Sequence, residues 1–128
     1  MWPFKPSVPN ISNESGVINW FLNYDDKASE AKRKFPSANL EVIKKSILKD
    51  VLDNNSFEKL TKVFKELEQK HTETLKHMAL MSPNFESFSR DEMIQFGTLG
   101  FDEVFYIVEL RILGYFLLKK YGLDPRKI

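Results

Sequence analysis

Two histidines are the side chains of this sequence best suited to metal binding or proton transfer, and their spacing limits both. His71 and His77 are six residues apart, which places them about 240° apart around a helix, so one ion cannot be held by both. Glu68 and His71 form a Glu-x-x-His pair, the spacing that supplies metal ligands in ferritin-like bundles. Such a site needs a second pair, whereas Glu73 and His77 have the wrong spacing. The sequence therefore predicts no metal site, and His71 is expected to be a core-face residue hydrogen-bonded to a neighbour.

Other catalytic arrangements are equally hard to assemble from these residues. The absence of cysteine excludes thiolate nucleophiles, zinc-thiolate sites, iron-sulfur clusters and disulfides. No Gly-x-Ser-x-Gly elbow occurs, and the Gly97-Thr98-Leu99-Gly100 segment lacks the spacing and the lysine of a phosphate-binding loop. Pairs of adjacent carboxylates, such as Asp102 with Glu103, point about 100° apart on a helix and suit helix starts or solvated faces. We therefore expect no catalytic residue, no cofactor and no enzymatic activity.

The charge balance argues against nucleic acid as a partner. Nineteen basic and 18 acidic residues give a net charge of +1, which supplies no general field to attract a polyanion. The densest basic cluster, Lys27, Lys32, Arg33 and Lys34, is interleaved with the acidic residues Asp25, Asp26 and Glu30. The sequence predicts no nucleic-acid binding.

Membrane insertion and export are also not expected. The longest apolar tract, Val104 to Leu118, is interrupted by Glu109 and Arg111, and it is shorter than the ~20 residues that a bilayer requires. The first nine residues contain three prolines and lack the apolar run of a secretory signal. These features predict a cytoplasmic protein without a membrane span.

The length and composition favour one folded domain over residues 1–128. With 128 residues, 42% of them hydrophobic, the chain has the size and apolar content of a single globular core. Residues 1–12 show no periodicity and are expected to form an extended N-terminal segment anchored by Trp2 and Phe4. Apolar residues at steps of three and four then predict helices over residues 15–34, 40–52 and 57–80. Pro36 should end the first of these helices, and Asn55 with Glu58 should begin the third.

The last third of the chain is expected to contain two helices. Ser89 and Glu92 form a capping box that predicts a short helix over residues 90–96. Gly97 and Gly100 should end it, because two glycines in a helix interior cost about 2 kcal/mol relative to alanine. A final helix should run over residues 101–121 and end at Gly122. The expected fold is all-α, an antiparallel up-down bundle of four main helices plus a short accessory helix.

The final helix is apolar on every side, so that both of its faces require a cover. Its two faces carry Phe101, Phe105, Val108, Ile112 and Tyr115 on one side, and Tyr106, Leu110, Leu113 and Leu117 on the other. One face can pack on the remaining helices. The second could be covered by tight packing within the chain, by the N-terminal segment, by another subunit or partner protein, or by a hydrophobic ligand. Arg111 interrupts this surface and requires a charged partner.

These features lead to an expected function in protein binding. Aromatic residues make up 13% of the chain, and aromatics are enriched at the cores of interfaces. We expect a small binding or regulatory module that contacts a partner protein, or a second copy of itself in a homodimer, through its final helix. The expected contact residues are Tyr106, Leu110, Arg111, Leu113 and Leu117. The alternative is a helical bundle that binds a small apolar ligand in its core, with Arg111 or His71 as the polar contact.

Overall fold

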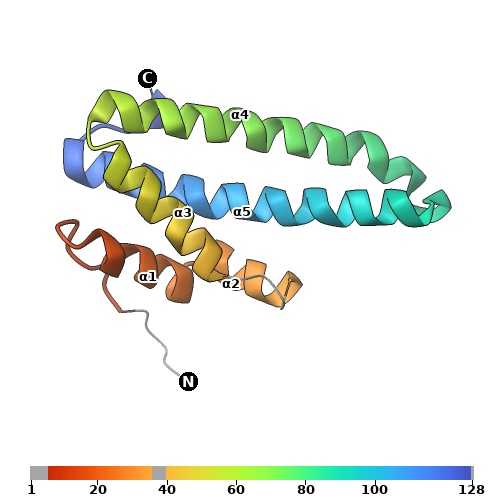
Figure 1. Ribbon diagram of the computed structural model, residues 1–128, viewed down its shortest axis with the longest axis horizontal. Coiled ribbons are helices and arrows are strands. Elements are labelled where there is room, and N and C mark those ends of the chain that lie inside the picture. Colours follow the sequence, from red (N-terminus) through yellow and green to blue (C-terminus); the bar gives the residue numbers. More distant parts are fainter. Residues whose placement is uncertain (1–5, 36–39, 128) are drawn as a thin grey trace.

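The computed structural model describes residues 6–35 and 40–127, and these residues are all-α (Figure 1). Five α-helices and two short 3₁₀ helices, η1 and η2, occur in the described ranges, and no strand is present there. Their bounds are α1 Glu14–Tyr24, α2 Asp26–Lys34, α3 Leu40–Asp53, α4 Phe57–Met81, η1 Ser82–Ser87, α5 Arg90–Tyr121 and η2 Pro125–Lys127. The predicted fold class is confirmed. The predicted anchors Trp2 and Phe4, and the predicted stop at Pro36, lie outside the described residues.

Helices α4 and α5 form a long antiparallel hairpin that organises the structure (Figure 1). The shorter helices α1, α2 and α3 pack toward one end of it, where they contact each other and α5. In the view of Figure 1, α1 and α2 lie on the side of α5 opposite to α4, and the hairpin extends beyond them. The result is a helical bundle with helices of very unequal length.

The first predicted helix is in fact two helices. A single helix was expected over residues 15–34, but Asp25 adopts an extended conformation with φ −71° and ψ 140°. Its carboxylate accepts a hydrogen bond from the backbone N–H of Lys27 at 2.9 Å, so Asp25 caps the start of α2. The prediction of an unbroken helix was therefore wrong at this residue.

The predicted break at Gly97 to Gly100 was also wrong. Helix α5 runs without interruption from Arg90 to Tyr121. Gly100 is enclosed by side chains of two other segments, since the Phe35 ring lies 3.5 Å and the Met78 methyl group 3.8 Å from where its Cβ would be, and such packing offsets the low helix propensity of glycine. The accessory helix and the final helix are thus one helix.

The helix ends follow local sequence signals in most cases. The Ser89–Glu92 capping box is present, with both hydrogen bonds formed, at 3.2 and 3.0 Å. Gly122 ends α5 in the left-handed conformation, with φ 71°, as expected for a C-terminal glycine. Helix α4 is capped by Ser56, whose hydroxyl accepts from the N–H of Lys59, rather than by the predicted Asn55.

Candidate interaction surface

The second face of α5 is covered largely by the chain itself. Leu113 and Leu117 are 0% exposed, and Leu110 is 4% exposed. They belong to one core cluster with residues of α1, α3 and α4, such as Phe64. Of the covers that the sequence left open, packing within the chain is the one found for these three leucines. In this conformation they are not available to a partner.

The other two predicted contact residues, Tyr106 and Arg111, are half-buried. The Arg111 guanidinium donates three hydrogen bonds to the carboxylate of Asp25, from Nε at 3.0 Å to each oxygen and from Nη2 at 2.8 Å to Oδ2. Asp25 is itself buried, so this pair fixes the junction of α1 and α2 against α5. Tyr106 lines a shallow surface pocket with Leu99 of α5 and with residues of α4 including His77.

Glu109 is a buried carboxyl group in the middle of α5. It is 2% exposed, and its Oε1 accepts a hydrogen bond from the Ser46 hydroxyl at 3.2 Å. Burial raises the pKa of Glu109 to about 7, and the nearby carboxylate of Asp50 acts in the same direction. Glu109 is therefore held largely protonated at mildly acidic pH.

The histidines are engaged in hydrogen bonds between the two long helices. His71 Nε2 lies 3.0 Å from Glu103 Oε1, which confirms the predicted hydrogen bond to a neighbour, and both side chains are half-buried rather than part of the core. His77 lies on the exposed side of α4, with Nε2 3.4 Å from the amide of Gln95. Within residues 6–35 and 40–127, no group of three or more potential metal ligands comes together.

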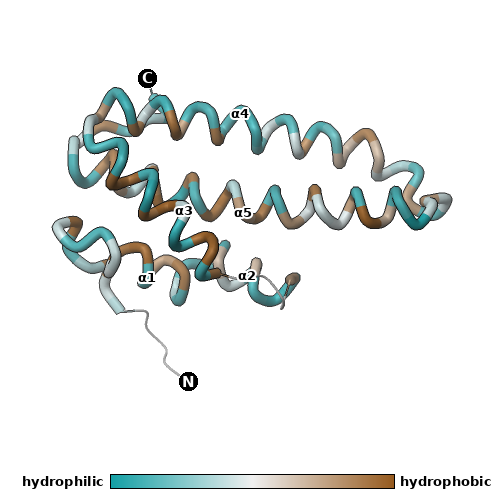
Figure 2. The backbone as a smooth tube through the Cα atoms, in the orientation of Figure 1, coloured by the Kyte–Doolittle hydropathy of each residue, from teal (hydrophilic) through white to brown (hydrophobic). Residues whose placement is uncertain are grey.

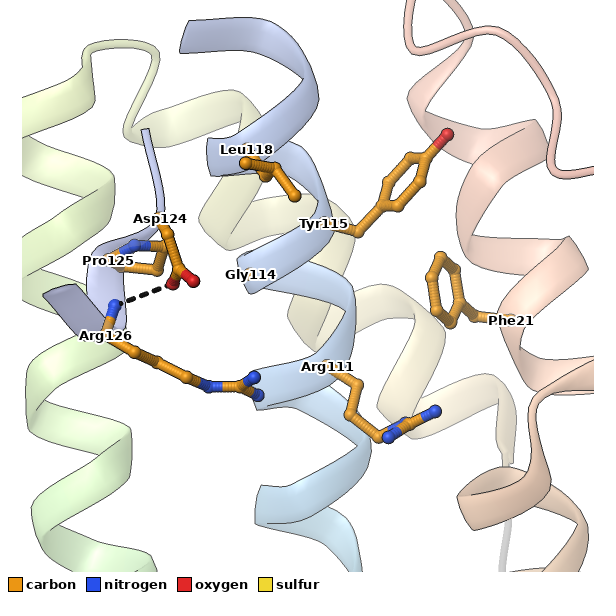
Figure 3. A pocket seen from close by; sticks show the side chains of 8 residues that line it. All are labelled: Phe21, Arg111, Gly114, Tyr115, Leu118, Asp124, Pro125 and Arg126. Atoms are coloured by element: carbon orange, nitrogen blue, oxygen red, sulfur yellow. Dashed lines mark hydrogen bonds between the residues drawn. The ribbon is translucent and has the colours of Figure 1, made fainter. Parts of the chain in front are cut away.

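One pocket lies beside Arg111, between α5, α1 and the C-terminal residues (Figure 3). It has a volume of about 230 Å³ and opens to solvent. Its apolar lining includes Phe21, Tyr115 and Leu118. Arg126 reaches along its wall, while Arg111 is already bound to Asp25.

The most exposed apolar region lies elsewhere, in the part of the hairpin formed by residues 68–103, which we call the distal hairpin. None of its residues is buried, because α1 to α3 cover only the other end of α5. The remaining described residues, which we call the body, contain every buried side chain of the described ranges. Half of the large apolar side chains that are strongly exposed in these ranges belong to the distal hairpin: Leu75, Leu80, Phe85, Met93 and Ile94.

Hydrophobic residues continue along both helices to the end of the distal hairpin (Figure 2). Near its tip, Phe85, Phe88 and Phe96 form an aromatic cluster with ring centroids 5.4 to 5.9 Å apart. These rings hold η1 onto the start of α5 but do not exclude solvent, since Phe85 remains 50% exposed.

The distal hairpin was not predicted from the sequence, because a helix break was expected at Gly97 to Gly100. Without that break, α5 has the length to accompany all of α4, and no other helix in the described part of the chain is long enough to cover the pair. The lengths of the helices, rather than any motif, would have indicated that the end of this hairpin is left uncovered.

Comparisons with known proteins do not add an assignment. No protein-family model, no curated protein and no solved structure matches this chain. No helix in the described ranges combines the length and apolar character needed to cross a bilayer.

Proposed function

We propose that this chain is a protein-binding module that contacts its partner through the distal hairpin, with the body serving to anchor α5. The observation that carries the proposal is the exposure of five large apolar side chains within a segment that has no buried residue. Single exposed apolar residues are ordinary on protein surfaces, but a concentration of them is typical of interaction sites. Methionine and phenylalanine, both present here, are common at such contacts.

The proposal retains α5 as the binding helix and moves the contact toward its N-terminal half. Leu110, Leu113 and Leu117 are needed for the core, whereas Met93 and Ile94 are 48% and 58% exposed. Tyr106, half-buried at the boundary with the body, can form the edge of the same contact. Action in the cytoplasm and the lack of enzymatic activity remain predictions from the sequence.

Photo-crosslinking in the cells that produce the protein tests this proposal. Benzoylphenylalanine is placed at Ile94 or, as the control, at Leu52 of α3, which is 57% exposed and also aliphatic. We expect adducts with one defined second protein from position 94 and none from position 52. Equal crosslinking from both positions, or none from position 94, would contradict a binding role for the distal hairpin.

Binding of a small apolar ligand is the second candidate, and the pocket beside Arg111 supports it. Phe21, Tyr115 and Leu118 offer an apolar lining. The volume of about 230 Å³ is smaller than the roughly 300 to 1,000 Å³ of typical ligand sites, and Arg111 is occupied by Asp25, so we rank this candidate below protein binding. Calorimetric titration with a short fatty acid, compared between wild type and Leu118→Trp, would detect a ligand site if only the wild type bound.

A further inference from the structure

One side of α5 carries a stripe of apolar residues that is buried in the body and exposed in the distal hairpin. Ile94, Phe101 and Val108 follow one another at steps of seven residues, so they share one side of α5. Val108 is 1% exposed, whereas Ile94 is 58% exposed. Between them, Phe101 contacts Phe35 at the end of α2, with ring centroids 5.9 Å apart. The cover of this stripe therefore ends near Phe101, and the stripe itself continues.

Helix α2 packs on α5 next to the exposed part of this stripe, and it combines small buried side chains with a basic last turn. Helix α2 buries only small side chains, Ala28 and Ala31, and its last turn consists of Lys32, Arg33 and Lys34. Lys27 and Lys34 line a small pocket with Glu30, with which both form ion pairs, and with Glu103 of α5. A short helix with a small apolar face and a basic last turn is thus the kind of element that this surface of α5 already accepts within the chain.

The distal hairpin is also acidic, although the whole chain is nearly neutral. Residues 68–103 contain seven acidic and three basic residues. These are Glu68, Glu73, Glu86, Asp91, Glu92, Asp102 and Glu103 against Lys70, Lys76 and Arg90. The remaining residues of the chain carry the opposite excess. The surface thus attracts basic groups, and the attraction weakens as salt rises.

Two of these carboxylates lie beside the exposed stripe. Asp91, Thr98 and Asp102 are spaced by seven and four residues, so they form a line next to Ile94 and Phe101. Asp91 and Asp102 are separated by about 16 Å along the helix axis. Neither side chain forms a hydrogen bond or ion pair within the described part of the chain. The apolar stripe is therefore flanked by two carboxylates that are free to pair.

We infer that the distal hairpin receives a basic amphipathic helix from a partner protein, which lies on α5 as a continuation of the layer formed by α2. This inference rests on the proposed function and specifies the partner's chemistry. Acidic residues of the distal hairpin disfavour a second copy docked hairpin to hairpin, because like charges would be brought together. The partner's apolar side chains cover Ile94 and Phe101, and its lysine or arginine residues pair with Asp91 and Asp102.

A pair of synthetic peptides tests the inference on the full chain. Each has about 14 residues and spans about 21 Å as a helix, with alanine and leucine on one face. One peptide carries lysines on the other face, and the second carries glutamates instead. Fluorescence anisotropy is measured with wild type, with the double variant Asp91→Asn/Asp102→Asn, with Ile94→Ser and with the control Leu52→Ser.

We expect the basic peptide alone to bind wild type, and to bind more weakly as salt is raised. The double variant should weaken binding by about fivefold to tenfold, Ile94→Ser by about tenfold, and Leu52→Ser should leave it unchanged. Equal binding of both peptides, or binding that none of the hairpin variants weakens, would overturn the inference. A wild-type dimer in light scattering that Ile94→Ser dissociates would assign the surface to a second copy instead.

The two experiments can fail independently. Crosslinking from position 94 without binding of the basic peptide would refute the partner's chemistry and leave the proposed function in place. Failure of both would remove the distal hairpin as a binding site.

Discussion

The body and the distal hairpin are built on the same helix, α5, yet they differ in how many layers surround it. In the body, α1 to α3 on one side and α4 on the other bury residues such as Val108 and Leu113 completely. In the distal hairpin, α4 accompanies α5 throughout, whereas α2 reaches α5 only near Phe101 and Glu103, and residues 68–103 include no buried side chain. The spacing of apolar residues thus indicates which side of a helix can be buried. Whether that side is buried depends on the number of helices that pack against it.

The same substitution should have opposite outcomes in the two regions. Leu117→Glu places a carboxylate without a partner in the body, and the cost of several kcal/mol is comparable to the total stability of a small domain, about 5–15 kcal/mol. Ile94→Glu adds an exposed charge and should change the free energy of unfolding by less than about 1 kcal/mol. Circular dichroism melts compare both variants with wild type. A stably folded Leu117→Glu variant would mean that this face of α5 is free after all.

A second difference concerns the dependence of stability on pH, because the body contains Glu109, a buried carboxyl group with a raised pKa. The pKa of Glu109 is about 7 in the folded chain and near 4.5 in the unfolded chain. Between these values the folded state retains a proton that the unfolded state has lost. Stability should therefore fall as pH rises from about 4.5 through about 7, by about 3 kcal/mol in total.

Urea unfolding of wild type and Glu109→Gln at pH 5 and pH 8 checks this expectation. The glutamine variant keeps a neutral polar group and should lose this part of the pH dependence. If the two proteins lost the same stability between pH 5 and pH 8, Glu109 would not be the responsible group.

The regions also differ in their ion pairs. Asp25→Ala removes the partner of Arg111 and the cap of α2, and should cost about 2–3 kcal/mol. Glu103→Ala removes the contact with His71 in the more exposed distal hairpin, and should cost less than about 1 kcal/mol. Chemical denaturation at neutral pH measures both. Equal costs would indicate that the pair in the body is not more strongly held than the pair in the hairpin.

The smallest expected effect is a gain of stability in the distal hairpin. Gly97 lies inside α5, and a Cβ added there would meet no atom within 4 Å. Gly97→Ala should raise the stability of the hairpin by up to about 1 kcal/mol through helix propensity alone. Hydrogen exchange of amides in residues 90–103 provides the measurement. Faster exchange in the variant would show that α5 needs the flexibility of glycine at this point.

Local signals in the sequence predicted much of the fold. The periodicity over residues 40–52 and 57–80 located α3 and α4, and the capping box at Ser89 and the glycine at position 122 located both ends of α5. These features depend on residues a few positions apart. Predictions from such neighbours succeeded at these positions, and the cap of α4, expected at Asn55 and found at Ser56, is an exception.

The failures involve contacts between distant parts of the chain. The break at Asp25 is stabilised by Arg111, 86 residues away, and periodicity cannot register that partner. Helix α5 continues through Gly100 where Phe35 and Met78, both distant in the sequence, pack beside it. Burial of Leu113 and Leu117 depends on helices whose relative placement the sequence pattern did not specify, so three of the five residues predicted as contacts, Leu110, Leu113 and Leu117, are core residues.

Because α5 is uninterrupted, a movement of its N-terminal half in the distal hairpin is mechanically coupled to the body. Its 32 residues correspond to a rod of about 48 Å, and Ile94 lies about 25 Å along the axis from Arg111, which is tied to Asp25 in the body. A tilt of the rod by about 10° about that attachment would displace the surface around Ile94 by about 4 Å. If a partner binds the hairpin as proposed, the force that it applies is transmitted to the junction of α1 and α2, where the ion pair of Asp25 with Arg111 opposes the movement.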